Sequence, residues 1–171
     1  GATESRSLPT KGIDAKGVVQ AMTFLTQQTK SLYGETIPNQ ISAKDKNVIV
    51  IGGGDTGSDC IGTSNRQGAK SVTNFEIMAK PPVERSASTP WPYWPLQLKT
   101  SSSHEEGCER NWLINTKEFL TNEKGELTGL ITVEVSWKIT PGKRPELIEK
   151  EGSEKTWPCE LALLALGFTG P

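Results

Sequence analysis

The sequence has few cysteines, a single histidine and no long apolar run. Its three cysteines, Cys60, Cys108 and Cys159, lie far apart and include no C-x-x-C pair, so the chain alone offers no ligand set for zinc or an iron–sulfur cluster. The longest apolar run, 161–166, is far shorter than the roughly 20 apolar residues of a membrane helix. No signal peptide is visible, so we expect a protein of the reducing cytoplasm without a membrane span or a metal site.

Neither sign of charge dominates: 19 Lys and Arg residues face 20 Asp and Glu residues, which gives a net charge of -1. Without a basic stripe or a polybasic cluster, the sequence does not indicate a nucleic acid or an anionic membrane as a partner. The length of 171 residues is sufficient for one domain with its own core. The chain starts with Gly instead of Met, in a stretch that reads as a loop, and we expect a piece of a longer protein.

The most informative feature is a β-branched run at 48–51 that leads directly into the glycine pattern G-x-G-x-x-G. Gly52 would allow a tight turn, Gly54 would let the backbone approach a pyrophosphate, and Gly57 would let a helix pack close to the strand. The pyrophosphate would lie on the N-terminus of that helix, where free N–H groups favour negative charge. The alternative is a glycine-rich turn without a ligand. The expected pyrophosphate contacts are Gly53, Asp55, Thr56 and Gly57.

Hydrophobic periodicity places the remaining elements around this motif. It predicts helices over 15–33, with Asp14 as N-cap, and over 55–67. It predicts strands over 46–51, 71–77 and 161–168, a hairpin from 112–120 and 127–138, and a charged, solvent-facing stretch over 143–154. Together they indicate an α/β fold: a Rossmann-like domain whose mostly parallel sheet is flanked by helices, with an added antiparallel β-hairpin.

The choice of nicotinamide cofactor depends on the end of the second strand. Glu76 lies there, about 20 residues after the glycines, where a carboxylate accepts hydrogen bonds from the adenosine ribose and would repel the 2′-phosphate of NADP. This favours NADH over NADPH. Alternatively Glu76 only faces water, and Arg66, Lys80 or Arg85 hold a 2′-phosphate.

Hydride transfer needs stacking and a short distance more than a side-chain acid, so we assign no catalytic residue. His104, followed by Glu105 and Glu106, suggests a metal site or proton relay, but we expect an ordinary surface loop there. The proline-rich loop that carries Trp91 and Trp94 would cover the nicotinamide, contact a partner subunit or cap the sheet; these alternatives stay open.

Five blocks in the same order resemble the small (beta) subunit of glutamate synthase: V-I-G-G-G-D-T-G-S-D-C-I-G-T-S-N-R-Q-G-A-K-S-V, N-F-E-I-M-A-K-P-P, P-W-P-Y-W-P, H-E-E and L-A-L-L-A-L-G-F-T-G-P. The resemblance extends over the chain and implies a flavoprotein with two dinucleotide-binding domains, in which the NAD(P)H domain is inserted into the FAD domain. It implies that 1–44 is a linker and helix leading from the FAD domain, and that 45–171 is the NAD(P)H-binding domain ending at the return crossover. Gly167 would then lie near the nicotinamide or the flavin junction.

In that family NAD(P)H reduces FAD, and electrons pass through iron–sulfur clusters to FMN in the large subunit, where glutamate forms from 2-oxoglutarate and glutamine-derived ammonia. This sequence lacks the N-terminal cluster cysteines and the first glycine fingerprint that would hold FAD. The resemblance therefore implies a piece that binds nicotinamide nucleotide and does little chemistry alone. Its expected partners are the FAD domain of the same polypeptide, the large subunit and, for the isolated piece, a second copy bound through an exposed inter-domain face.

Two other interpretations remain open. One is the NAD(P)H domain of a related flavin and iron–sulfur oxidoreductase that reduces ferredoxin or a pyrimidine. That relative shares G-G-G-D-T but is less expected to carry P-W-P-Y-W-P together with H-E-E. The other is a stand-alone nucleotide-binding module that senses redox state and transfers nothing.

Overall fold

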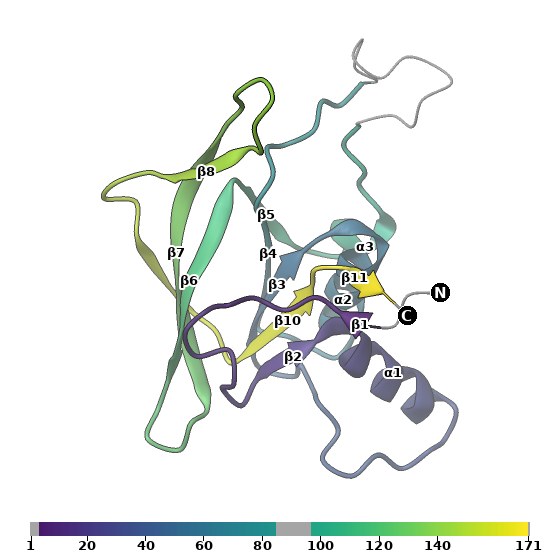
Figure 1. Ribbon diagram of the computed structural model, residues 1–171. Coiled ribbons are helices and arrows are strands. Elements are labelled where there is room, and N and C mark those ends of the chain that lie inside the picture. The colour runs from purple at the N-terminus through teal and green to yellow at the C-terminus, as the bar shows by residue number, and fades with distance from the viewer. Residues whose placement is uncertain (1–3, 85–96, 171) are drawn as a thin grey trace.

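The computed structural model describes residues 4–84 and 97–170, and its centre is a five-stranded parallel sheet (Figure 1). The strand order is β2-β10-β3-β4-β5, and each neighbouring pair is parallel. The strands are β2 (Val18–Gln20), β10 (Leu161–Ala165), β3 (Asn47–Gly52), β4 (Ser71–Glu76) and β5 (Glu109–Trp112). Their carboxyl ends meet at one edge of the sheet, where open α/β folds bind ligands.

Both faces of this sheet are buried, which explains the continuous apolar runs of its central strands. Val48 and Val50 point to one side, in a core shared with the helices. Ile49 and Ile51 point to the other side, in a second core. The helices are α1 (Ala21–Leu32), α2 (Gly54–Arg66) and the short α3 (Ser102–Glu105).

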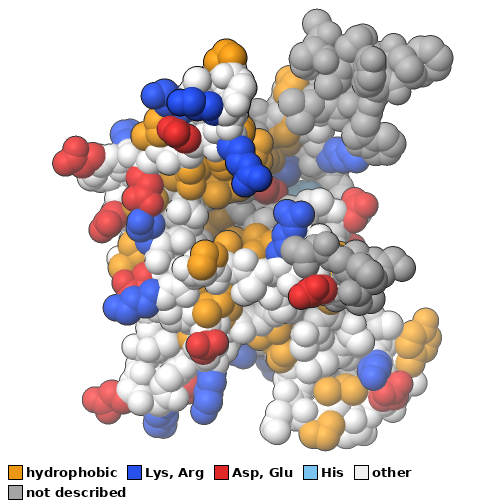
Figure 2. Space-filling view, viewed as in Figure 1, with side chains coloured by type: hydrophobic (Ala, Val, Ile, Leu, Met, Phe, Trp, Pro, Cys, Tyr) orange, Lys and Arg blue, Asp and Glu red, His pale blue; other side chains and the backbone are white. Residues whose placement is uncertain are grey.

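An antiparallel sheet covers the face opposite the helices, so the molecule has three layers (Figure 1). Its strands are β6 (Ile114–Thr121), β7 (Leu127–Lys138), β8 (Glu146–Glu149) and β9 (Lys155–Pro158), and β7 pairs with the other three. Figure 2 shows basic and acidic side chains interspersed on this side of the molecule. A small ribbon of β1 (Glu4–Ser5) and β11 (Phe168–Gly170) brings the two ends of the described chain together (Figure 1).

The predicted fold class is confirmed: a parallel dinucleotide-fold sheet with helices and an added antiparallel hairpin. The structure refines it, because the described helices pack on one face and the antiparallel sheet takes the place of helices on the other. The strand, helix and strand around the glycine motif lie within two residues of their predicted bounds. No helix among the described residues is long and apolar enough to cross a membrane.

The helix predicted over 15–33 is wrong in its first part. Gly17 has φ +110, which a helix does not accommodate, and Val18–Gln20 pair in parallel with Ala162–Leu164. The helix therefore begins at Ala21, and its N-cap is Gln20 instead of Asp14. Pairing with the edge of β10 makes Val18–Gln20 a strand, whereas helical spacing alone predicts a longer helix.

Three further segments differ from the expected bounds. The strand predicted over 112–120 divides at Leu113, whose φ of +56 lets β5 end in the parallel sheet while β6 starts in the antiparallel one. The charged stretch 143–154 is largely exposed, as predicted, but contains β8. The last strand ends at Ala165. Trp91 and Trp94 lie outside the described residues, so the alternatives for their loop stay predictions.

Candidate functional site: a cleft at the carboxyl ends of β3, β4 and β5

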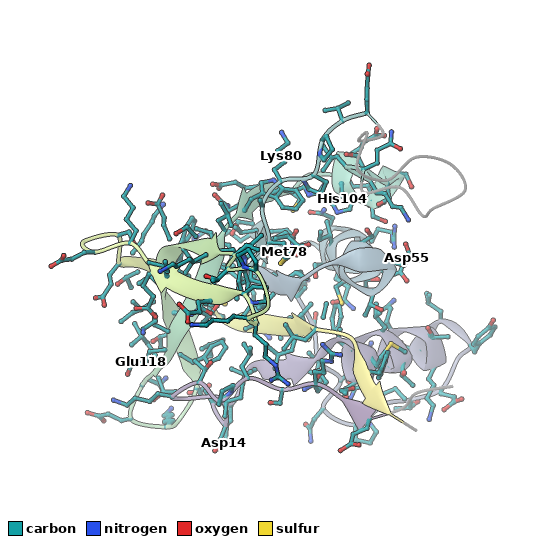
Figure 3. The ribbon with its side chains drawn as sticks, turned by 45° about the horizontal axis from the view of Figure 1, so that its top comes forward. Asp14, Asp55, Met78, Lys80, His104 and Glu118 are labelled. Atoms are coloured by element: carbon teal, nitrogen blue, oxygen red, sulfur yellow. The ribbon has the colours of Figure 1, made fainter. Side chains whose placement is uncertain are left out.

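A cleft of about 620 Å³ opens at the carboxyl ends of β3, β4 and β5. Among the described residues, its walls come from the glycine turn and the start of α2, from the end of β4 with residues 78–82, and from residues 97–101, His104 and β5. Figure 3 shows Asp55, Met78, Lys80 and His104 toward one end of the molecule, away from Asp14 and Glu118. The cleft has the volume of a small-molecule site and lies where the fold predicts one.

The three glycines of the motif meet the geometric demands expected of them. Gly52 has φ +99, and a Cβ there would collide with the carbonyl oxygen of Ala165. Gly54 has φ +68, and no atom lies within 4 Å of the position its Cβ would take, so this side of the turn is open. A Cβ on Gly57 would lie 3.3 Å from the carbonyl oxygen of Gly52, which shows how closely α2 approaches the strand.

The N-terminus of α2 lines the cleft without a side-chain cap. Its N-cap residue is Gly53, which has no side chain to bond the N–H groups of the first turn. These groups and the positive end of the helix dipole favour an anion at this position. Gly53, Asp55 and Gly57, three of the four residues expected to contact the pyrophosphate, line the cleft, as does Gly54; the contacts themselves stay a prediction.

Asn74 on β4 fixes the turn from beneath. Its side chain is buried, and its amide donates to the carbonyl oxygens of Val50 at 3.0 Å and Gly52 at 2.7 Å. These bonds hold the last carbonyls of β3 against the neighbouring strand, and Asn74 also lines the cleft. No sequence pattern predicted this residue, because an Asn inside a predicted buried strand carries no pattern of its own.

Glu76 lies at the end of β4 beside the glycine turn. A Cβ on Gly53 would collide with its Oε1, so the carboxylate approaches the turn closely. The side chain is half-buried, and burial raises the pKa of Glu76 above its ordinary value, while the nearby Arg110 guanidinium opposes this rise. Glu76 therefore stands in the cleft where the sequence analysis expected it.

Arg110 on β5 is a cleft residue that the sequence analysis missed. Its guanidinium carbon lies 4.7 Å from the centre of the Trp112 ring, and its Nη1 donates to the carbonyl oxygen of Lys99 at 3.1 Å. Its Nε is buried and has no hydrogen-bond partner. No sequence signal identified it, because β5 is a short strand that follows the proline-rich loop and has no apolar run.

His104 lies on α3, at the wall of the cleft, where a plain surface loop was expected. Its Nδ1 accepts a hydrogen bond from the backbone N–H of Ser101 at 3.1 Å, which caps the helix. Burial and the Arg110 guanidinium lower the pKa of His104, so the neutral ring that can accept this bond is favoured. The structure gives His104 a capping contact within the wall.

Known proteins resemble the chain over its full length. A glutamate synthase (NADPH) small chain from Mycobacterium tuberculosis is 44% identical over 100% of this chain, which covers 35% of that protein. A glutamate synthase (NADH) from Saccharomyces cerevisiae is 42% identical over 100% of this chain, which covers 8% of that protein. This chain is homologous to one segment of glutamate synthase. No protein-family model matches it.

A solved structure shares the fold of this chain. Mycobacterium tuberculosis FprA in complex with NADPH has a TM-score of 0.65 at 12% identity, over 100% of this chain and 49% of that chain. At this identity the likeness shows the fold alone. The chain spans about a third or less of the length of these two glutamate synthases, and about half of the solved structure.

Four residues predicted for the nucleotide site do not line the cleft: Gly52, Thr56, Arg66 and Gly167. Arg66 ends α2, roughly 18 Å along the helix axis from Gly54, and its Nη1 lies 2.8 Å from the carboxylate of Glu106. Thr56 faces the groove between α1 and α2. Gly167 has φ +82 and lies exposed between β10 and β11. Lys80 does line the cleft, and Arg85 is outside the described residues.

The three thiols are separate from this site's chemistry. Cys60 and Cys159 are buried, and burial raises the pKa of each to about 12. Cys108 is half-buried, with a pKa raised to about 11, also chiefly by burial. Thiols that remain protonated at neutral pH are poor nucleophiles and poor metal ligands. Within 4–84 and 97–170, no group of His, Cys, Asp and Glu is arranged to hold a metal ion.

Proposed function

We propose that this chain is the nicotinamide-nucleotide domain of a glutamate synthase small subunit, or of the corresponding segment of a longer glutamate synthase. It would bind NAD(P)H and present it to FAD, so that hydride transfer drives glutamate synthesis from glutamine and 2-oxoglutarate. The observation that carries the proposal is the open, uncapped glycine turn at the start of α2, with Glu76 beside it. Homology to glutamate synthases supports the assignment to this enzyme.

Different residues of the cleft would bind different parts of the nucleotide. The first N–H groups of α2, from Gly54 onward, would bind the pyrophosphate. The Glu76 carboxylate would accept hydrogen bonds from the adenosine ribose, as acidic residues at the end of the second strand do in this fold. The chain's contribution to hydride transfer is then binding and orientation, which needs no acid or base from the cleft.

Glu76 also supports NADH as the favoured cofactor. A carboxylate close to the turn accepts the two ribose hydroxyls of NADH and repels a 2′-phosphate. The relatives do not decide the choice, since one is named for NADH and another for NADPH at similar identity. We therefore propose NADH as the preferred ligand, with the preference resting on this one side chain.

The remaining groups of the whole enzyme would lie elsewhere. Three separated cysteines, two of them buried, do not fit an iron–sulfur cluster, and the single glycine fingerprint is already assigned to NAD(P)H, so FAD and the clusters would bind other parts of the enzyme. We propose the FAD domain of the same polypeptide, meeting 1–44 and the end of 45–171, and the large subunit as partners, in the cytoplasm. Self-association of the isolated chain remains a prediction.

Calorimetric titration of the chain with NADH, in the wild type and two glycine variants, tests the proposal. Gly54 and Gly125 both have positive φ and open space where a Cβ would go, but Gly125 lies in the β6–β7 turn. Gly54→Ala and Gly125→Ala should each lose about 1–2 kcal/mol of unfolding free energy from the left-handed backbone. Only Gly54→Ala should also lose NADH affinity, about tenfold or more, because its methyl group enters the phosphate position.

An unchanged NADH affinity in Gly54→Ala would contradict the proposed pyrophosphate position. Equal losses in both variants would show that general destabilisation, and not the glycine turn, governs binding. Absence of NADH and NADPH binding to the wild-type chain would contradict the proposed function for this piece. The same titration on the longer protein would then test whether the site needs the FAD domain.

A further inference from the structure

We propose that Arg110 is a specificity-determining residue, which binds the 2′-phosphate of NADPH and lets the cleft accept the phosphorylated cofactor despite Glu76. The proposal rests on the proposed nucleotide-binding function and adds a residue to that site. Its basis is the position of the Arg110 guanidinium beside Glu76, its partly unused hydrogen-bonding capacity and its fixed geometry.

The sheet register places Arg110 next to the strand that carries Glu76. In the parallel pairing of β4 with β5, Asn74 lies opposite Arg110 and Glu76 lies opposite Trp112. Partners in such a register share one face of the sheet, and all four residues line the cleft. A ribose bound by Glu76 at the end of β4 would therefore have Arg110 on the neighbouring strand within the same cleft.

The Arg110 guanidinium is held in place, but not all of its N–H groups have a hydrogen-bond partner. It lies over the Trp112 ring and donates through Nη1 to the Lys99 carbonyl oxygen. Its Nε is buried without a hydrogen-bond partner and is therefore closed to a ligand, whereas its Nη2 makes no hydrogen bond within the described residues and is the group left for a phosphate oxygen. Planar guanidinium groups bind phosphate oxygens through two parallel N–H groups, and fixed ones lose little freedom in doing so.

The charge of Arg110 is available to a ligand. Among the described residues, Glu76 and Arg110 form no ion pair, because no carboxylate oxygen of Glu76 lies within 4.0 Å of an Arg110 nitrogen. Their longer-range electrostatic interaction still lowers the pKa of Glu76. Exposed Lys80, on the same cleft, adds a second positive charge.

Two small nucleotides separate this inference from the proposed function. Adenosine 2′,5′-bisphosphate carries the 2′-phosphate of NADPH, whereas 5′-AMP presents only the unmodified ribose. Both are titrated calorimetrically into wild type, Arg110→Gln, Arg110→Lys and Arg144→Gln. Arg144 is an exposed arginine between β7 and β8, so its variant is the matched control for loss of one positive charge.

We expect Arg110→Gln to lose about tenfold or more in affinity for the 2′-phosphorylated probe, the size of a charge-assisted hydrogen bond. Its affinity for 5′-AMP should change by less than about threefold, and Arg144→Gln should leave both affinities unchanged. Arg110→Lys should fall between wild type and Arg110→Gln, because it keeps the charge but loses the planar fork. Melting temperatures of the four proteins confirm that each variant is folded.

Other outcomes overturn the inference. If Arg110→Gln weakens both probes equally, Arg110 supports the whole site and does not select the phosphate. If wild type binds 5′-AMP but not the bisphosphate, Glu76 excludes the phosphate and Arg110 does not compensate; the proposed function then stands without this inference. If wild type binds neither probe, this inference fails, and the NADH titration described above decides separately whether the proposed function stands.

Discussion

At the scale of single residues, the geometry of the glycine turn depends on a side chain outside the glycine motif. Asn74 donates to the carbonyl oxygens of Val50 and Gly52, and the second of these carbonyls is the one that Gly57 approaches. The amide therefore connects β3, β4 and the start of α2 at one point. A glycine motif alone permits this turn, whereas Asn74 selects one conformation of it.

Replacement of Asn74 by alanine should expose this role. The buried carbonyl of Val50 and the partly buried carbonyl of Gly52 would each lose a donor, so we expect Asn74→Ala to lower the unfolding free energy by about 1–3 kcal/mol and to weaken NADH binding. Asn65→Ala is the control, because Asn65 makes one exposed bond, to the Gly107 carbonyl oxygen. Denaturant unfolding and calorimetry measure both quantities. Equal destabilisation by the two variants would contradict a special role for Asn74.

At the scale of elements, local sequence patterns predicted the segments whose own sequence determines their structure. The β-branched run of β3, the glycines and the alternation of β7 are local signals, and they predicted these elements and the Glu76 position. Val18–Gln20 and Glu109–Trp112 are different, because each becomes a strand only by pairing with a distant strand. The site residue Arg110 was missed for the same reason: its strand is defined by β4 and not by its own residues.

The strand Val18–Gln20 also determines how the N-terminal segment belongs to the domain. Within 1–44, β2 pairs with β10, and Phe24 on α1 is fully buried among residues of β3 and β10. This packing makes α1 part of the main core. A helix stabilises the core through the side chains on its buried face. On α1, one buried and one exposed residue form a matched pair with which this contribution can be measured.

Phe24→Ala should therefore destabilise the whole domain. Removing a fully buried Phe side chain costs about 3–5 kcal/mol, whereas Leu32→Ala on the same helix should change stability by less than about 0.5 kcal/mol, because Leu32 is 77% exposed. Urea unfolding monitored by circular dichroism compares the two variants. A small effect of Phe24→Ala would mean that α1 is an appendage whose packing adds little to the fold.

At the scale of the whole molecule, the antiparallel sheet packs against the parallel sheet that carries the cleft, on the face opposite the helices. It shares a core with the parallel sheet, and Phe75 of β4 packs edge-on against Trp157 of β9 at 4.9 Å between ring centres. It also bonds the cleft wall directly: Trp137 donates through its indole N–H to the carbonyl oxygen of Ile77 at 3.0 Å. The backbone N–H of Leu113 donates to the carbonyl oxygen of Met78, at the start of that wall.

Layers that share one core should unfold together, and native-state hydrogen exchange tests this. Leu130 of β7 is fully buried between the two sheets, so Leu130→Ala should cost about 2–5 kcal/mol. If the layers form one cooperative unit, the amide of Leu163 in β10 should lose the same protection free energy as amides of β7. If Leu163 instead keeps its wild-type protection while β7 exchanges faster, the antiparallel sheet opens on its own. Such opening would release the Trp137 bond to the Ile77 carbonyl oxygen, next to the cleft wall, and make nucleotide affinity depend on a layer of which no described strand residue lines the cleft.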